Sequence, residues 1–128
     1  MRLVDGLKWP VVALIATGML HLAAEAIRPD LRTDFGPTMV GAILLAYGLW
    51  IGFGLVSRGV PARTAILAGA VVGLLPLVLD VVGFGILLGR GLDTGITSGL
   101  FGFLVIVFGS LAGAAFGTSR AVPGAASS

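Results

Sequence analysis

The stretch VVGLLPLVLDVVGFGILLG, residues 71–89, decides the fold, because only one of its nineteen side chains can carry a charge. That side chain is Asp80, which follows Pro76 by four residues. An apolar run of this length is typical of a helix that crosses a bilayer, whose hydrocarbon core is ~30 Å thick. The stretch therefore predicts a membrane span, and it raises the question of why the span contains a carboxylate.

The composition of the whole chain agrees with a membrane protein. Of its 128 residues, 57% are hydrophobic and 11% charged, and the mean hydropathy is +1.09. Soluble domains carry roughly 25% charged residues. The net charge is only +2 and no basic cluster is present, so we expect no nucleic-acid partner. The chain has no cysteine, which excludes disulfides and Cys-ligated metals.

Four apolar segments predict an all-α, polytopic transmembrane bundle within residues 1–118. We place the helices at residues 9–27, 38–56, 65–88 and 96–116, each long enough to cross the bilayer at ~1.5 Å per residue. Residues 119–128 are small and polar, and we expect them to form a disordered tail. An alternative for the first segment is a signal peptide cleaved near Ala24-Glu25-Ala26, which would leave three helices.

The distribution of basic residues predicts the orientation. Cytoplasmic loops of membrane proteins carry an excess of Lys and Arg. The termini and the second loop contain five basic residues, and the first and third loops contain three, accompanied by acidic residues. We therefore expect both termini to lie in the cytoplasm. The five are Arg2, Lys8, Arg58, Arg63 and Arg120, and the three are Arg28, Arg32 and Arg90.

The two external loops share the pattern D-x-G-x-T, at residues 34–38 and 93–97. One explanation is local, since Asp and Gly favour turns and Thr can cap a helix start. The other is a duplicated two-helix hairpin, which would give two parallel halves related by an axis along the membrane normal. His21 and Asp80 are separated by the same number of residues as the two patterns, so a duplication would make His21 and Asp80 equivalent positions.

Four polar side chains are predicted to share one slab in the outer half of the membrane: Asp80, His21, Glu25 and Tyr47. The helical rise places His21 and Asp80 ~9–12 Å, and Tyr47 ~13 Å, inside the outer boundary. A charged carboxylate at this depth costs ~2.5–3.5 kcal/mol on insertion scales, so it should point inward, find a partner or remain protonated. His21 is the partner we expect for Asp80, held in turn by Glu25. Such a cluster could be purely structural or could mark an ion or proton path.

Glycines repeat at four-residue spacing on three of the predicted helices. This spacing puts them on one helix face and lets backbones approach closely, either within the chain or between subunits. Gly83, Gly85 and Gly89 instead indicate a loosened helix end after Asp80. The predicted packing glycines are Gly109, Gly113 and Gly117 on the fourth helix, Gly69 and Gly73 on the third, and Gly48 and Gly52 on the second.

The chain lacks the nucleophile-elbow, phosphate-loop and zinc-protease motifs, so we expect no enzyme, no cofactor and no metal site. Two functions remain. The first is an oligomeric proton- or ion-coupled transporter or channel, in which Asp80 is the titrating group that binds the proton or ion, and His21 and Glu25 form the relay that passes it on. The second is an accessory or scaffold subunit that docks on a larger membrane complex through its glycine-lined faces. Besides the lipid bilayer, the expected partner is a second copy or that complex.

Overall fold

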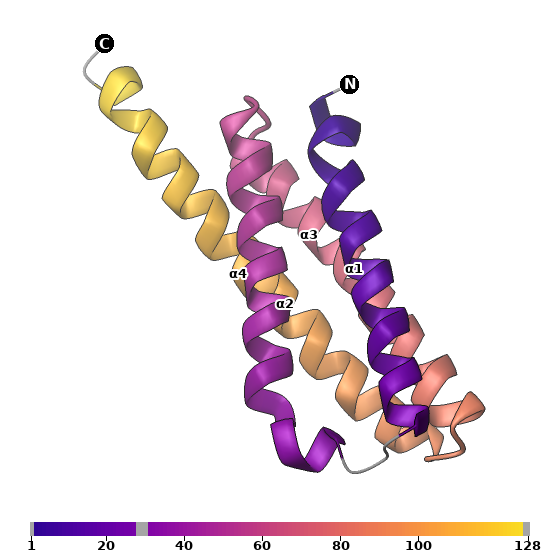
Figure 1. Cartoon of the computed structure of the whole chain (residues 1–128). Helices are drawn as coiled ribbons and strands as arrows, with labels where there is room; N and C mark the ends of the chain where they lie inside the picture. Colours follow the sequence, from indigo (N-terminus) through magenta and orange to yellow (C-terminus); the bar gives the residue numbers. More distant parts are fainter. Residues whose placement is uncertain (1, 28–30, 127–128) are drawn as a thin grey trace.

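The chain forms an all-α bundle of four long helices (Figure 1), as the hydropathy predicts. A computed structural model describes residues 2–27 and 31–126. Helix α1 spans Arg2–Ile27, α2 Leu31–Ser57, α3 Ala62–Asp80 and α4 Leu92–Ala126, and a π-helix, η1, spans Val81–Leu87 directly after α3. Four segments of the described chain are long and apolar enough to cross a membrane: Leu3–Ile27, Val40–Ser57, Ala62–Leu87 and Leu92–Thr118.

The helices run alternately up and down, so both chain ends lie at one end of the bundle (Figure 1). We call this the proximal end; it also holds the turn at residues 58–61. Gly59 closes α2 there with φ +86°, and the amide of Val60 donates to the Leu55 carbonyl. Glycine suits this position because it has no Cβ to clash in the left-handed region. The opposite, distal end holds the end of α1 and the turn from η1 to α4 at residues 88–91.

The helices extend beyond the apolar segments from which we predicted them. Helix α1 begins at Arg2, so Pro10 lies inside it rather than at its start. Helix α4 continues to Ala126, through most of the residues 119–128 that we expected to be disordered. Hydropathy reports only the part of a helix that is apolar. A helix that has already formed propagates at low cost through small or polar residues at its ends.

The third span changes its helix type at Asp80. Helix α3 ends at Asp80, and η1 continues the span to Leu87 with wider turns. Its hydrogen bonds reach further along the chain: the Leu88 amide donates to the Gly83 carbonyl at 2.8 Å. We expected a loosened helix end here from the glycines, and the change to a π-helix is the form that it takes. π-Helical turns are uncommon and occur frequently at functional sites.

Helices α2 and α4 make the most extensive contact in the bundle, and glycines line it. A Cβ atom on Gly48 would lie 2.6 Å from the Ile106 carbonyl oxygen, and one on Gly109 would lie 2.8 Å from the Leu45 carbonyl oxygen. Both distances are shorter than non-bonded atoms allow. The backbones therefore approach this closely only because these positions have no side chain, which is how small residues pack membrane helices.

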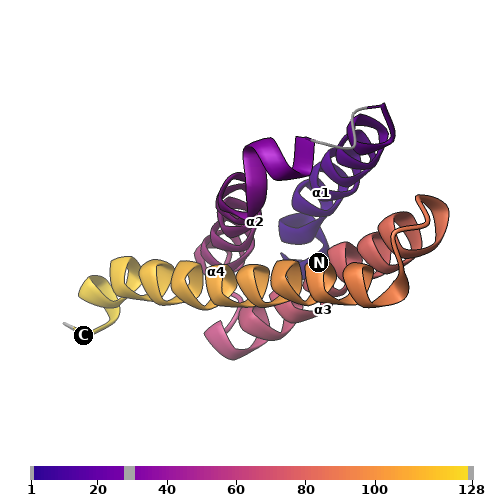
Figure 2. The same cartoon turned by 90° about the horizontal axis from the view of Figure 1, so that it is seen from below.

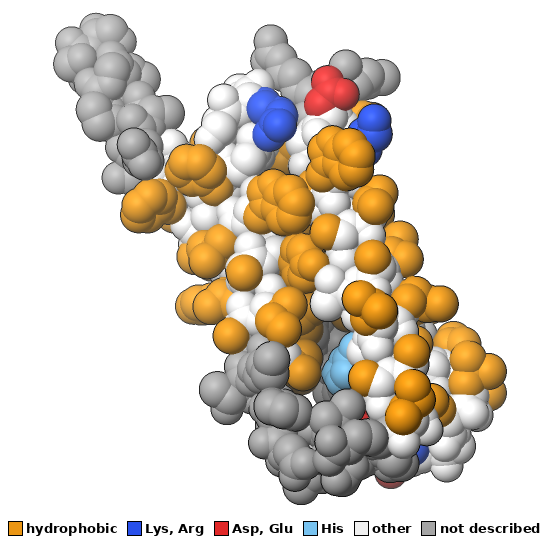
Figure 3. Space-filling model, viewed as in Figure 1, with side chains coloured by type: hydrophobic (Ala, Val, Ile, Leu, Met, Phe, Trp, Pro, Cys, Tyr) orange, Lys and Arg blue, Asp and Glu red, His pale blue; other side chains and the backbone are white. Residues whose placement is uncertain are grey.

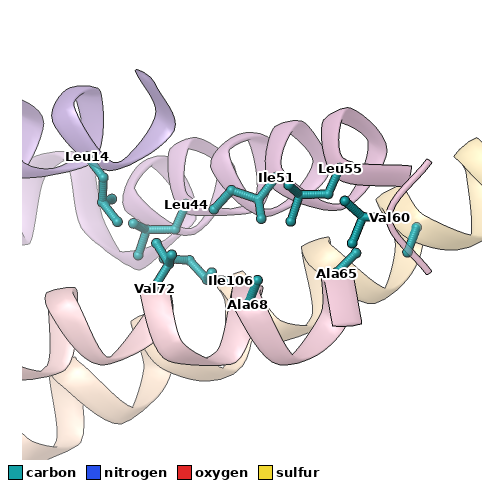
Figure 4. Packing of buried hydrophobic residues seen from close by; sticks show 10 residues of the cluster. Leu14, Leu44, Ile51, Leu55, Val60, Ala65, Ala68, Val72 and Ile106 are labelled. Carbon is teal, nitrogen blue, oxygen red and sulfur yellow. The ribbon is translucent and has the colours of Figure 1, made fainter. Parts of the chain in front are cut away.

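The apolar core lies between α2, α3 and α4, with a smaller contribution from α1 (Figure 4). Ile51, Leu55, Ala65 and Ile106 have no exposed surface. Large apolar side chains such as Trp9, Leu67 and Phe108 are instead exposed. Figure 3 shows hydrophobic side chains over much of the face that it draws. Small residues inside and large apolar residues outside are the arrangement expected of a multi-pass membrane protein.

Helix α1 is the most peripheral of the four. Its apolar window is the least buried, and it packs on α2 and, more lightly, on α3 (Figure 2). Near the proximal end Gly6 lies against Leu55 of α2, and further along Gly18 lies against Leu79 of α3. The distal part of α1 is held mainly by polar side chains, which form the candidate site.

Candidate functional site: polar contacts inside the bundle

The four polar side chains predicted to form one cluster take part in contacts at three places in the bundle. Tyr47 belongs to a contact between α1 and α2. His21 and Glu25 belong to a contact between α1 and the η1–α4 turn. Asp80 belongs to a contact between α3 and α4. Each set joins two parts of the chain that are distant in sequence.

Tyr47 of α2 is hydrogen-bonded to α1. Its hydroxyl lies 2.6 Å from the Thr17 hydroxyl and donates to the Ala13 carbonyl oxygen at 3.2 Å. The Thr17 hydroxyl also donates to the Ala13 carbonyl oxygen, at 2.8 Å. The Tyr47 ring stacks on Trp50, with ring centroids 6.2 Å apart. The two hydroxyls and the carbonyl form one polar group inside an apolar bundle, in which each hydroxyl proton has an acceptor.

Glu25 is the one charged side chain among the described residues that is fully buried. Nη2 of Arg90, in the η1–α4 turn, lies 3.1 Å from Oε2 of Glu25, and Nε2 of His21 lies 3.6 Å from Oε1. Within the described chain neither oxygen has a partner at hydrogen-bonding geometry. The contact with Arg90 is therefore an ion pair, stabilised by charge rather than by directed hydrogen bonds, and it compensates a carboxylate that would be costly to bury alone.

His21 lies between this ion pair and the π-helix. Its ring meets the Phe84 ring edge to face, with centroids 5.5 Å apart, and the Phe84 side chain is buried. The His21 side chain keeps 34% of its surface exposed. Figure 3 shows the single histidine of the chain at the surface between α1 and α2. His21 and Arg90 are thus two partly exposed groups beside the buried carboxylate.

Asp80 lies at the junction of α3 and η1, facing α4. The Ser98 hydroxyl donates to its Oδ2 at 2.8 Å. Close packing brings the two segments together here, because a Cβ on Gly95 would lie 2.8 Å from the Asp80 carbonyl oxygen. A hydroxyl that donates to a carboxylate makes a charge-assisted hydrogen bond. Direct contact between Asp80 and His21, which we expected, stays a prediction.

The sequence pointed to the acidic groups of these contacts and to His21 as the neighbour of Glu25, but it missed Thr17, Ser98 and Arg90. Thr17, His21 and Glu25 follow one another at four-residue spacing, so they form one stripe on α1, and that spacing could have identified Thr17. Ser98 lies in an apolar run, and its sequence context does not identify it as a partner of Asp80. Arg90 was assigned to the loop as a basic residue that sets orientation, and nothing in its sequence context indicates that it reaches Glu25.

All seven predicted packing glycines are buried within the chain. Gly48 and Gly52 lie against α4, and Gly113 and Gly117 lie against α2, as Gly109 does. On α3, Gly69 lies against Ser110 and Gly73 against Phe103, both on α4. The glycines therefore hold the bundle of one chain together. These seven glycines are therefore used within one chain, and docking of an accessory subunit on a larger complex stays a prediction.

In the part of the chain that the structure describes, no three His, Cys, Asp or Glu side chains gather as a metal site would require. The chemistry available to the described polar contacts is that of carboxylates, one imidazole, one guanidinium and hydroxyls. These groups can bind and exchange protons or attract a small cation. No protein-family model, curated protein sequence or solved structure matches the chain.

Proposed function

We propose that the protein is a proton- or ion-coupled membrane transporter in which Asp80 is the group that binds the transported proton or cation. One observation carries the proposal: a carboxylate lies within the third apolar span, at the residue where α3 becomes a π-helix. Ionisable side chains inside membrane spans mark ion and proton paths by default. Interrupted membrane helices are the elements on which secondary transporters build their binding sites.

The contacts at the distal end support a route between Asp80 and water. His21 is partly exposed, and it touches both Glu25 and Phe84, which follows Asp80 by one turn of the π-helix. An imidazole can accept a proton at one nitrogen and donate one from the other, so the partly exposed His21 is suited to receive a proton from water at this end. With both termini in the cytoplasm, as the basic residues predict, this route opens to the outside.

Four helices are too few to enclose a wide pathway, so the proposal includes a second copy of the chain. The glycine faces are used inside the bundle, and the two copies would meet through larger apolar side chains. The mass of the purified protein in mild detergent tests this, and a monomer that nevertheless transports protons would remove the second copy from the proposal.

Proton uptake into reconstituted vesicles tests the function. Vesicles loaded with a pH-sensitive dye are given a K⁺ diffusion potential, and internal acidification is followed. Asp80→Asn should abolish the protein-dependent signal, because an amide cannot carry the proton. Asp93→Asn is the matched control, since Asp93 is an exposed carboxylate in the first turn of α4. Uptake by the Asp80→Asn protein equal to that of the parent would refute the proposal.

The second candidate is an accessory or scaffold subunit. It is favoured by the fact that each described polar set joins two parts of the chain, as purely structural contacts do. On this hypothesis Asp80→Asn lowers the stability of the bundle, and the parent protein conducts no protons. The same vesicle experiment therefore separates the two candidates.

A further inference from the structure

The proximal end of the bundle carries an excess of positive charge. Lys8, Arg58 and Arg63 lie there, and Asp5 is the one acidic side chain described at this end. All four are exposed, and within the described chain none of them forms an ion pair. Figure 3 shows basic side chains at this end, above hydrophobic ones. The edge of the membrane-spanning region therefore presents cations that the described chain does not neutralise.

Arg58 is held at the junction of α2 with α1. Its Nη1 donates to the Gly54 carbonyl oxygen at 3.1 Å, so the side chain folds back along α2. Its Cδ lies 3.5 Å from the point that a Cβ on Gly6 of α1 would occupy, so its stem also packs on α1. The hydrogen bond to Gly54 uses Nη1 alone, and a guanidinium has further N–H donors on its other nitrogens. Arg58 is thus fixed in position and still able to bind an anion.

An exposed indole follows Arg58 toward the middle of the membrane. A Cβ on Gly54 would lie 3.4 Å from Arg58 Nη1 and 3.8 Å from Trp50 Cδ1, so both side chains flank one point on α2. Trp50 is 45% exposed, and it precedes Arg58 by eight residues, or ~12 Å along the helix. A cation at the end of the span and an exposed apolar ring beneath it thus lie beside one another on α2.

These groups match the parts of a phospholipid. A guanidinium can bind a phosphate through two parallel N–H···O bonds, which the point charge of a lysine cannot do. Arg58 directly follows the apolar span Val40–Ser57, so it lies at the level where the headgroups of a bilayer begin. The glycerol and the first part of an acyl chain would then run along α2 toward Trp50. The surplus of basic over acidic side chains at this end favours a headgroup with a net negative charge.

We propose that an acidic phospholipid binds at the proximal end of the α1–α2 junction, with its phosphate on Arg58 and an acyl chain against Trp50. Because Arg58 packs on both helices, the bound lipid supports the attachment of α1, the most peripheral helix of the bundle. With the termini in the cytoplasm, as the basic residues predict, the site faces the leaflet whose surface is negative. The proposal concerns a lipid partner and does not depend on transport.

Quenching of Trp50 fluorescence by brominated lipids tests the site. The chain has two tryptophans, so a Trp9→Phe protein leaves Trp50 as the only one. This protein is reconstituted into phosphatidylcholine vesicles that contain a small fraction of phosphatidylglycerol brominated midway along its acyl chains. A second sample contains the same fraction of brominated phosphatidylcholine. We expect the acidic lipid to be enriched around Trp50 about fivefold, the ratio that one basic side chain gives beside anionic lipid. Equal quenching by the two lipids would refute the site.

Two arginine variants separate a site on Arg58 from the general charge of this end. Arg58→Gln should bring quenching by the acidic lipid down to that by brominated phosphatidylcholine. Arg63→Gln is the matched control, because Arg63 is an exposed arginine at the same end but on α3, and this variant should keep the enrichment. Equal losses in the two variants, or full enrichment around a folded Arg58→Gln protein, would overturn the site.

Thermal melting reports whether the Arg58→Gln protein is folded. If it is not, Arg58→Lys takes its place. The lysine ammonium keeps the charge but cannot make two parallel bonds to a phosphate, so the enrichment should fall. Enrichment equal to that of the parent would then count against a phosphate on Arg58.

A third lipid tests the charge of the headgroup. Asp5 offers a partner for the amine of phosphatidylethanolamine, whose headgroup has no net charge. Brominated phosphatidylethanolamine should nevertheless quench Trp50 no more than brominated phosphatidylcholine does, because the surplus charge at this end is positive. Quenching equal to that by phosphatidylglycerol would overturn the preference for an acidic lipid.

Discussion

At the scale of single residues, Gly69 and Ser110 show how little space separates α3 from α4. A Cβ on Gly69 would overlap both Oγ and Cβ of Ser110, which is fully buried. Gly69→Ala should therefore destabilise the bundle by about 1–3 kcal/mol, the usual cost of overpacking. Adding Ser110→Gly removes both overlapping atoms and should recover most of that loss, as measured by SDS-induced unfolding in mixed micelles.

Gly54→Ala is the control for this pair, because its added Cβ would lie 3.4 Å from the Arg58 guanidinium, an ordinary contact. Alanine also favours helix over glycine by up to about 1 kcal/mol, so this variant should match or exceed the parent in stability. If the losses of Gly69→Ala and Ser110→Gly simply add in the double variant, the two residues do not meet as described.

The sequence predicts individual polar residues better than it predicts their partners. A carboxylate in an apolar run is visible without a structure, and so Asp80 and Glu25 could be named. Their partners depend on how each helix is rotated about its axis. Hydropathy does not reveal this rotation when a helix is apolar on all sides. Arg90 is the clearest case, because its role as partner of Glu25 depends on where the η1–α4 turn lies beside α1.

At the scale of helices, the contact between α2 and α4 should respond sharply to substitution. A Cβ on Gly113 would lie 2.5 Å from the Leu49 carbonyl oxygen and 2.9 Å from the Phe53 amide nitrogen. These are backbone atoms, so the helices must move apart to admit a side chain. We expect Gly113→Ala to lose about 2 kcal/mol or more and Gly113→Leu to prevent folding.

Thermal melting in detergent, together with size-exclusion mass, checks this prediction. The expected result is a lower melting temperature for Gly113→Ala at unchanged oligomeric mass, because the contact lies within one chain. Gly117→Ala serves as the milder comparison, since its Cβ would meet the Val56 side chain at 3.2 Å. A change of mass without a change of melting temperature would mean that Gly113 packs between chains instead.

Glycine spacing predicts that helices approach closely but not which helices pair. The repeats on three helices fitted an intrachain or an intersubunit contact equally well. The break after Asp80 was foreseeable from Pro76 and the following glycines. Its form as a π-helix was not, because neither hydropathy nor glycine spacing distinguishes α from π turns.

At the scale of the whole molecule, the orientation in the membrane remains a prediction. It rests on five basic residues in the termini and the second loop, compared with three in the first and third loops. Single cysteines in this cysteine-free chain can test it. Ser57→Cys, at the proximal turn, should be shielded from an impermeant thiol reagent added to intact cells, whereas Asp93→Cys, at the distal end, should react. The opposite pattern would place both termini outside the cytoplasm.

The number and alternation of the helices followed from hydropathy alone, because a span needs a minimum length of apolar chain and four such segments are separated by short polar ones. The order of packing did not follow. Helix α1 is peripheral and α4 central, and glycines of α4 lie against both α2 and α3.

The pairing of α2 with α4 also determines when the protein can assemble during its synthesis. The two helices run in the same direction, and the whole of α3 and η1 is translated between them. At ~5–20 residues per second, a nascent α2 waits on the order of several seconds before its partner leaves the ribosome. Throughout that interval its glycine face, with unshielded carbonyls such as that of Leu49, is open to other helices in the membrane. Chains that terminate before α4 should therefore be recognised as incomplete and removed by membrane proteases.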